Sequence, residues 1–213
     1  MLTLRFLRRT RFRKTLGEGG FTLLGVIFAL AFVVTVVSAL GLLTARTIRA
    51  GRLSEERFIA TALAREGIEL VRGLRDENWF AHSQGATQIK WRGDDVGTLE
   101  EQRRAICNGT WIIDSQNPRL VASSDTNANR ELFLSGPPND AYVHGGVGTP
   151  TRFRRLVTIS STTGNCRDVV SAVQSPPPDP ILVKVRVEWN EPAGGSARAL
   201  EMHNELYDWI RQR

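Results

Sequence analysis

Residues 21–43 read FTLLGVIFALAFVVTVVSALGLL, a run of 23 residues without a charged side chain. At about 1.5 Å per residue this run forms a helix of roughly 34 Å, which is enough to cross the ~30 Å hydrocarbon core of a bilayer. Every face of the helix is apolar, whereas a surface helix of a globular protein has a polar side. The run therefore predicts a membrane-spanning helix. The alternatives are a buried helix of a soluble core and an ordinary secretory signal peptide, whose apolar region is usually only ~7–15 residues.

The positive charge of the chain lies before this run. The sequence has 28 basic and 22 acidic residues, which gives a net charge of +6. Residues 1–20 contain six of the basic residues and only one of the acidic residues. The rest of the chain is nearly balanced, which argues against nucleic-acid binding through global charge. Four further arginines follow the run, with two glutamates among them. Because the heavier basic cluster stays in the cytoplasm, we expect the N-terminus inside and the C-terminal part outside, as in a single-pass cytoplasmic-membrane protein.

The junction between the basic start and the apolar run is GGFTLLGV, residues 19–26. It resembles the leader of type IV pilins and type II secretion pseudopilins. A later segment, residues 64–79, also looks like a run found in PilV-type minor pilins. The resemblance implies that a prepilin peptidase cleaves after Gly20 and that the new N-terminal residue, Phe21, is N-methylated. It further implies assembly with other pilin or pseudopilin subunits on an inner-membrane platform. Glycine at the cleavage position leaves the backbone accessible to a protease.

The fifth position after the expected cleavage is Gly25, where major pilins carry a glutamate. In the family that carboxylate meets the N-terminus of a neighbouring subunit inside the apolar filament core. A buried charge of this kind needs its partner to offset the cost of desolvation. Gly25 removes one partner, which favours a minor, tip-proximal or priming subunit over a bulk shaft subunit.

After Leu43 the chain stays rich in helix-forming residues up to Trp79. Apolar residues and one glycine recur there at helical spacing and predict a stripe that docks on a globular domain. The stripe comprises Ile59, Leu63, Gly67, Leu70, Val71 and Leu74. Between the two apolar parts lies a polar neck, in which Gly51 is expected to loosen the helix and Ser54 to cap a restart.

The remaining chain carries short runs of strand-forming residues separated by stretches rich in turn formers. The clearest is residues 181–189, where apolar and charged side chains alternate. Other expected strands are 87–91, 111–114, 119–122, 131–134, 153–159 and 199–206, with turn-rich stretches at 135–150 and 175–180. We therefore expect an α+β fold: a long N-terminal hydrophobic helix packed on a C-terminal antiparallel β-sheet domain. The expected division is a leader at 1–20, a transmembrane and amphipathic helix at 21–80, and a β-rich domain at 81–213.

Both cysteines, Cys107 and Cys166, fall in the part expected outside. An oxidising exterior allows them to form a disulfide, and closing a loop of about 60 residues stabilises a fold by roughly 4 kcal/mol in the chain-entropy description. The alternative is two separate thiols. No histidine lies near them in the sequence, so no metal site is expected there.

No catalytic residue and no cofactor are expected. The three histidines, His82, His144 and His203, lie outside any recognisable catalytic motif. The sequence thus favours a minor pilin or pseudopilin, a structural subunit rather than an enzyme. The alternative function is a pilus-tip binding module for DNA or surfaces, for which the basic cluster Arg152, Arg154 and Arg155 is the candidate contact. A third reading is a single-pass enzyme facing outside, which would need convergent titratable groups in a deep pocket.

Overall fold

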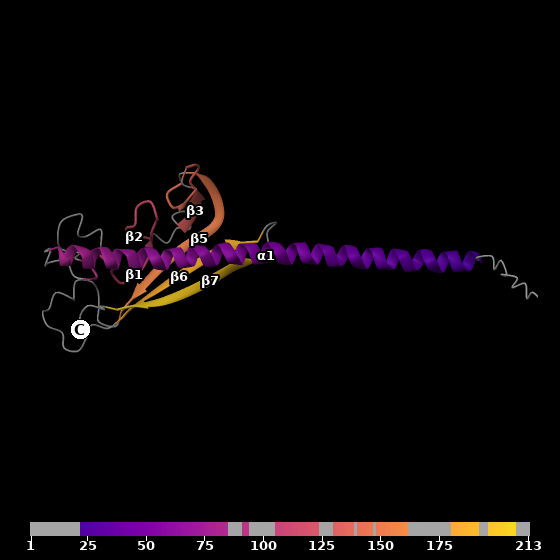
Figure 1. The fold of residues 1–213 in the computed structure, drawn as a ribbon, viewed down its shortest axis with the longest axis horizontal. Helices are drawn as coiled ribbons and strands as arrows, with labels where there is room; N and C mark the ends of the chain where they lie inside the picture. Colours follow the sequence, from indigo (N-terminus) through magenta and orange to yellow (C-terminus); the bar gives the residue numbers. More distant parts are fainter. Residues whose placement is uncertain are drawn as a thin grey trace, which may run out of the picture. The chain divides into compact units, whose positions relative to one another are not determined.

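The computed structural model describes residues 22–84, 91–93, 105–123, 130–138, 140–146, 148–161, 180–191 and 196–207. The chain divides into two compact units, Met1–Gly51 and Arg52–Arg213. The first unit contains the N-terminal part of a single long helix, and the second contains the rest of that helix together with a β-sheet. The expected α+β class, with a long apolar N-terminal helix packed on an antiparallel sheet, is confirmed (Figure 1).

Helix α1 runs from Leu23 to Ser83. It begins where the carbonyl of Thr22 accepts hydrogen bonds from the backbone N–H groups of Gly25 and Val26, at 2.8 and 3.3 Å. The expected interruption at Gly51 and restart at Ser54 is wrong, because both residues lie inside uninterrupted helix. A single exposed glycine costs a helix only about 1 kcal/mol relative to alanine, and the regular residues on either side outweigh that cost.

Seven strands follow the helix in the part of the chain that the structure describes. They are β1 (Gly109–Ile112), β2 (Val121–Ala122), β3 (Glu131–Leu134), β4 (Tyr142–Val143), β5 (Thr149–Ser160), β6 (Ile181–Asn190) and β7 (Ala197–Leu206). All of their pairings are antiparallel. The predicted strands at 131–134, 153–159, 181–189 and 199–206 are found with shifts of a few residues at most. The short strand β4 was not expected, since it lies within the stretch predicted to be turns. The expected strand at 87–91 falls almost wholly outside the described residues.

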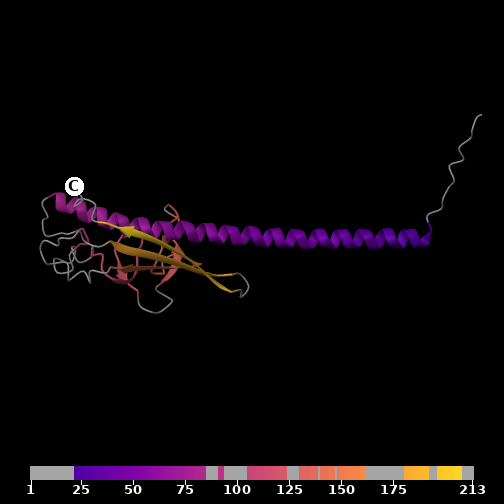
Figure 2. The ribbon, with the colours of Figure 1, turned by 90° about the horizontal axis from the view of Figure 1, so that it is seen from below.

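Strand β5 is the centre of the sheet. One of its edges pairs with β6 over eight residues, from Phe153 opposite Trp189 to Ser160 opposite Leu182. Its other edge is shared by β3 and β1, which pair with its first and last parts respectively. Strand β6 pairs in turn with β7 along its whole length. Figure 2 shows these long strands running beside the C-terminal half of α1, which places the sheet against one side of the helix.

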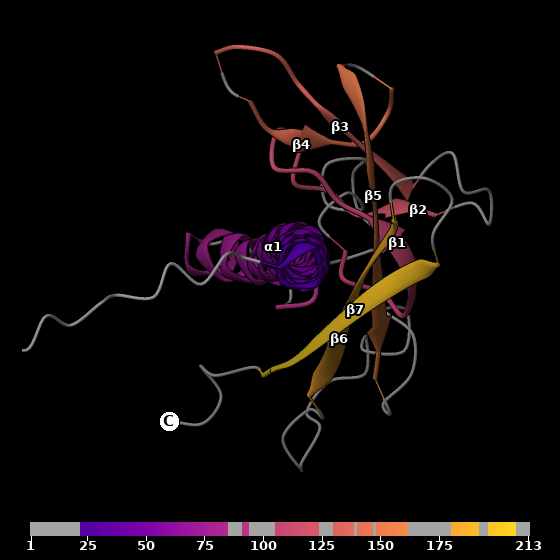
Figure 3. The ribbon, with the colours of Figure 1, turned by 90° about the vertical axis from the view of Figure 1, so that its right-hand side faces the viewer.

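The core of the second unit lies between α1 and the sheet. Alternate residues of β6 are buried, as the alternation predicts: Ile181, Val183, Val185, Val187 and Trp189. The buried residues of α1 are Glu56, Ala60, Leu63, Ala64, Gly67, Ile68, Val71, Leu74 and Asn78. Figure 3 looks along α1 and shows β5, β6 and β7 together on one side of it. A stripe one helical face wide is therefore enough to hold the helix on the sheet.

The predicted stripe is partly corrected by these positions. Leu63, Gly67, Val71 and Leu74 are buried as expected, whereas Ile59 and Leu70 are only half-buried at its margin. Small residues such as Ala60 and Ala64 take the centre instead. A side-chain methyl added to Gly67 would meet Cγ1 of Val185 at 3.0 Å, so the absence of a side chain there sets how closely helix and sheet approach.

Candidate membrane-anchor and assembly surface

The first part of α1, Leu23–Leu43, is called here the anchor segment. Its large side chains are exposed on all sides of the helix, with Leu23 80% and Phe32 71% exposed. Among the described residues, α1 is the one helix long and apolar enough to cross a membrane. Apolar area of this size is strongly unfavourable in water. The anchor segment therefore needs a lipid or protein environment that the described part of the chain does not provide.

The few polar side chains of the anchor segment are satisfied within the helix. The hydroxyl of Thr35 donates to the carbonyl oxygen of Ala31 at 2.9 Å, and the hydroxyl of Ser38 donates to that of Val34 at 2.8 Å. In a bilayer every polar group must find its partner inside the protein. These internal hydrogen bonds make the segment compatible with hydrocarbon.

The first turn of α1 carries no acidic residue. Gly25 lies in this turn, and its backbone N–H is bonded to the carbonyl of Thr22. The described start of the helix therefore offers no carboxylate to a neighbouring positive charge. Gly20 and Phe21, the predicted cleavage and methylation residues, lie outside the described residues, so both assignments stay predictions.

A buried arginine joins the helix to the sheet in the second unit. The side chain of Arg155 on β5 is 0% exposed and forms an ion pair with Glu66 of α1 at 3.2 Å. Its Nη1 donates to the carbonyl of Leu63 at 3.3 Å, and its Nη2 donates to the carbonyl of Ile113 at 2.6 Å. Burial lowers the pKa of Arg155, and the nearby carboxylates of Glu66 and Asp114 oppose that shift. One cation thus links three segments of the core.

A second polar contact lies near the start of the docked part of the helix. Glu56 accepts a hydrogen bond from Arg152 at 2.5 Å and another from the indole Nε1 of Trp189 at 3.1 Å. The Glu56 side chain is 9% exposed. A carboxylate so buried needs both donors to offset its lost hydration. Glu56 was not singled out from the sequence, because it interrupts the apolar pattern that marks the docking face.

The predicted basic cluster is divided between different surroundings. Arg155 is inside the core, Arg152 is paired with Glu56, and Arg154 lies on the opposite face of β5 from Arg155. Alternation along a strand places neighbouring residues on opposite faces, and this alone separates Arg154 from Arg155. The three arginines do not form one exposed patch.

A carboxylate and a histidine fasten the short strand β4. Asp114 Oδ1 accepts the backbone N–H of His144 at 2.9 Å and lies 2.5 Å from its Nδ1. The His144 side chain is 2% exposed. Burial alone would raise the pKa of Asp114, but the hydrogen bonds to His144 and the charges of His144 and Arg155 together lower it below its usual value. This contact ties the residue after β4 to the end of β1.

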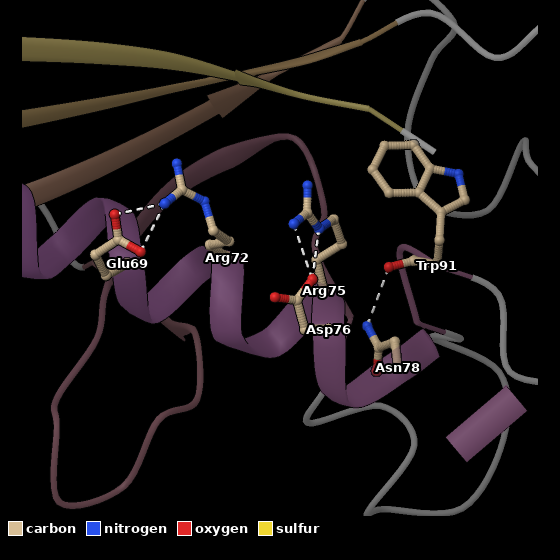
Figure 4. A network of polar contacts seen from close by, with 6 residues as sticks. All are labelled: Glu69, Arg72, Arg75, Asp76, Asn78 and Trp91. Carbon is tan, nitrogen blue, oxygen red and sulfur yellow. Dashed lines mark hydrogen bonds and ion pairs between the residues drawn. The ribbon is translucent and has the colours of Figure 1, made fainter. Parts of the chain in front are cut away.

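The charged residues of segment 64–79 pair mainly with one another on the surface. Arg72 contacts Glu69 at 2.6 Å one turn away, and Arg75 contacts the adjacent Asp76 at 2.8 Å (Figure 4). The Glu69–Arg72 pair is exposed, and pairs of this kind contribute little to stability. Asn78 is different: it is buried and donates to the carbonyl of Trp91 at 3.3 Å, which holds that residue against the end of the helix.

Cys107 is disulfide-bonded. Cys166, its predicted partner, lies outside the described residues, so the pairing of these two residues stays a prediction. Within the described ranges no three histidine, cysteine, aspartate or glutamate side chains gather in a way that would hold a metal ion.

Comparison with models of protein families, with curated proteins and with solved structures gives no match to this chain. A functional proposal for it therefore rests on its own residues and their geometry.

Proposed function

We propose that this chain is a minor pilin or pseudopilin, a structural subunit that is anchored in the cytoplasmic membrane and then assembled into a type IV pilus or a type II secretion pseudopilus. The observation that carries the proposal is the division of α1. Its first part is apolar and exposed all round, and its second part is docked on a sheet along one stripe. Such a subunit presents a free apolar helix for packing with other helices while its folded domain stays intact.

The junction sequence supports the same proposal. Gly20 and Phe21 precede Thr22 and the first helical residue in the sequence, and the resemblance of this junction to prepilin leaders implies cleavage after Gly20 and methylation of Phe21. Cleavage there removes the six basic residues of the leader and leaves the anchor segment attached to the folded domain. The basic leader favours an orientation with the N-terminus in the cytoplasm and the domain outside.

Assembly through helix packing requires no catalytic group in this chain. In a bilayer, helices associate through close packing and polar contacts rather than through the hydrophobic effect. The partners proposed are a prepilin peptidase, other pilin or pseudopilin subunits, an inner-membrane assembly platform and the lipid bilayer. The missing carboxylate at Gly25 favours a tip-proximal or priming position.

The test is mass analysis of the N-terminus of protein isolated from membranes of cells that have a prepilin peptidase. We expect a mature chain that begins at methylated Phe21. The variant Gly20→Ala should accumulate with its leader attached, whereas Gly25→Ala should be processed like the unaltered chain. Normal processing of Gly20→Ala, or a mature chain beginning at Met1 or near residues 40–46, would count decisively against the proposal.

A further inference from the structure

Three arginines, Arg46, Arg49 and Arg52, follow the anchor segment within α1 before the first acidic residue, and Arg46 and Arg49 are the two nearest to it. Arg46 and Arg49 are both exposed, and within the described part of the chain neither side chain has a carboxylate partner. No acidic residue occurs between Leu43 and Glu55. The pair, called here the arginine collar, is therefore a local positive charge that the described residues leave uncompensated.

The position of the arginine collar matches the headgroup layer of a bilayer. At about 1.5 Å per residue, Arg46 and Arg49 lie roughly 4.5 and 9 Å beyond Leu43 along the helix. The headgroup region on each side of the hydrocarbon core is about 5–8 Å thick. If the hydrocarbon ends near Leu43, the Cα atom of Arg46 lies within this layer and that of Arg49 lies just beyond it. Because helix side chains point back toward the N-terminus of the helix, both guanidinium groups can reach the level of the lipid phosphates.

The two side chains also lie close together around the helix. Residues three apart are neighbours on a helical surface, with about 5–6 Å between their Cβ atoms. A guanidinium group offers a planar fork of N–H donors that fits two phosphate oxygens at once. Two such forks side by side suit one or two phosphate groups presented by a lipid surface.

The other side chains around the arginine collar do not compete for the same ligand. The hydroxyls of Thr44 and Thr47 donate to the carbonyls of Leu40 and Leu43, both at 2.9 Å. Ile48, between the arginines, is 54% exposed. The segment therefore presents apolar surface and satisfied hydroxyls beside two free cations, as an interfacial segment requires.

We propose that Arg46 and Arg49 bind the phosphate groups of anionic phospholipids on the side of the membrane where the folded domain lies. The proposal rests on the membrane-spanning part of the proposed function and does not depend on filament assembly. Anionic lipids are favoured over zwitterionic ones because no acid in this stretch balances the two arginines. If the leader is removed after Gly20, the arginine collar is also the nearest basic flank of the anchor segment.

The experiment titrates the full-length protein in a zwitterionic detergent with phosphatidylglycerol and, separately, with phosphatidylcholine, and counts bound lipid by native mass spectrometry. The double variant Arg46→Gln, Arg49→Gln is compared with the matched control Arg57→Gln, Arg65→Gln. Arg57 and Arg65 are exposed residues farther along α1, so the control removes the same charge away from the proposed layer. An arm with excess inorganic phosphate distinguishes a lipid headgroup from a free phosphate ion.

We expect phosphatidylglycerol to bind more tightly than phosphatidylcholine, and the collar variant to lose about 25-fold in affinity for it, at about fivefold per arginine. The control variant should lose no more than about twofold, and phosphate should not displace the lipid. Equal binding of the two lipids, equal losses in the two double variants, or displacement by phosphate would each overturn the proposal.

A separate readout distinguishes failure of this proposal from failure of the proposed function. Resistance of the collar variant to carbonate extraction measures whether the anchor segment is inserted in the membrane. The mass of its N-terminal peptide shows whether the leader has been cleaved after Gly20. A collar variant that is processed, stays in the membrane and binds phosphatidylglycerol as well as the unaltered chain would refute lipid recognition alone. A collar variant that leaves the membrane would also refute it, because the anchor segment is sufficient for insertion in this proposal.

Discussion

The two parts of helix α1 have the same backbone geometry and opposite surroundings. In Leu23–Gly51 the side chains are exposed around the whole circumference, whereas Arg52–Ser83 has nine buried residues along one stripe. The second part packs its apolar side chains on the sheet of this chain, whereas the first part has no apolar partner among the described residues. Both parts are therefore helical, although only one of them packs on the sheet. The distribution of charged residues decides whether a part can bury its whole circumference or only one stripe.

The largest expected effect concerns the buried cation of the docked part. Arg155→Ala should destabilise the folded domain by about 3–5 kcal/mol, because it opens a cavity and leaves the carbonyls of Leu63 and Ile113 without their donor. Urea unfolding of the full-length protein in detergent, followed by tryptophan fluorescence, measures the change. Arg154→Ala on the opposite face of β5 is the matched control and should change stability by less than about 0.5 kcal/mol. Equal losses for the two variants would mean that Arg155 does not link helix and sheet.

A charge placed in the exposed apolar part tests the other side of the comparison. Val34 is 63% exposed in the anchor segment, and Val34→Asp should raise the free energy of membrane insertion by about 2.5–3.5 kcal/mol. The measurement is the fraction of protein that resists carbonate extraction. Ala62→Asp, at an exposed position of the docked part, should leave that fraction unchanged. If Val34→Asp also leaves it unchanged, the anchor segment is not in hydrocarbon.

Two glycines of the docked part should respond with opposite signs. Gly67→Val crowds Val185 at the helix–sheet contact and should cost about 1–3 kcal/mol. Gly73 is exposed and meets open space, so Gly73→Ala should stabilise the domain by about 0.5–1 kcal/mol through helix propensity. The unfolding temperatures of the two variants test which residues of α1 form the buried stripe. If Gly67→Val raised the unfolding temperature, Gly67 would not belong to that stripe.

The smallest expected effect is a pH dependence at β4. Because the pKa of Asp114 is lowered in the folded state, its contribution is fully present above the usual pKa of about 4 and is lost as the pH falls through the lowered value. Asp114→Asn should therefore lower stability by about 1 kcal/mol near pH 7 and by much less near pH 2. Urea unfolding across this pH range measures the difference, and a gap that stays constant with pH would exclude an ionised Asp114 as its source.

The elements that could be predicted from the sequence are those that a single local residue pattern specifies. The alternation of β6 and the uncharged run of the anchor segment each specify an element without reference to the rest of the chain. The exact docking stripe was harder, because Ala60 and Ala64 carry almost no hydrophobic signal and are central only because the sheet comes close. Strand β4 depends on its pairing with β3 and on the Asp114–His144 contact, which join residues far apart in sequence.

The buried polar contacts were missed for a related reason. Glu56 and Arg155 are charged residues, a type that is usually exposed. Their burial can be recognised only from their positions, Glu56 on the buried face of α1 and Arg155 among the alternate buried residues of β5. In retrospect, the phase of Phe153, Val157 and Ile159 places Arg155 among the inward residues of β5. The helical phase of Leu63 likewise places Glu56 on the docking face, seven residues earlier. Its partners Arg152 and Trp189 have no such local signal, because they come from two distant strands.

The distance in sequence between helix and sheet has a consequence for the order of folding. Glu56 is separated from Trp189 by 133 residues, and Leu63 from Arg155 by 92. The apolar stripe of α1 is therefore synthesised long before the strands that cover it, and contacts of such long range form late. Incompletely folded chains with exposed apolar surface are prone to aggregate. In the proposed topology, the anchor segment enters the bilayer first and tethers each nascent chain, so the domain completes its fold at the membrane surface.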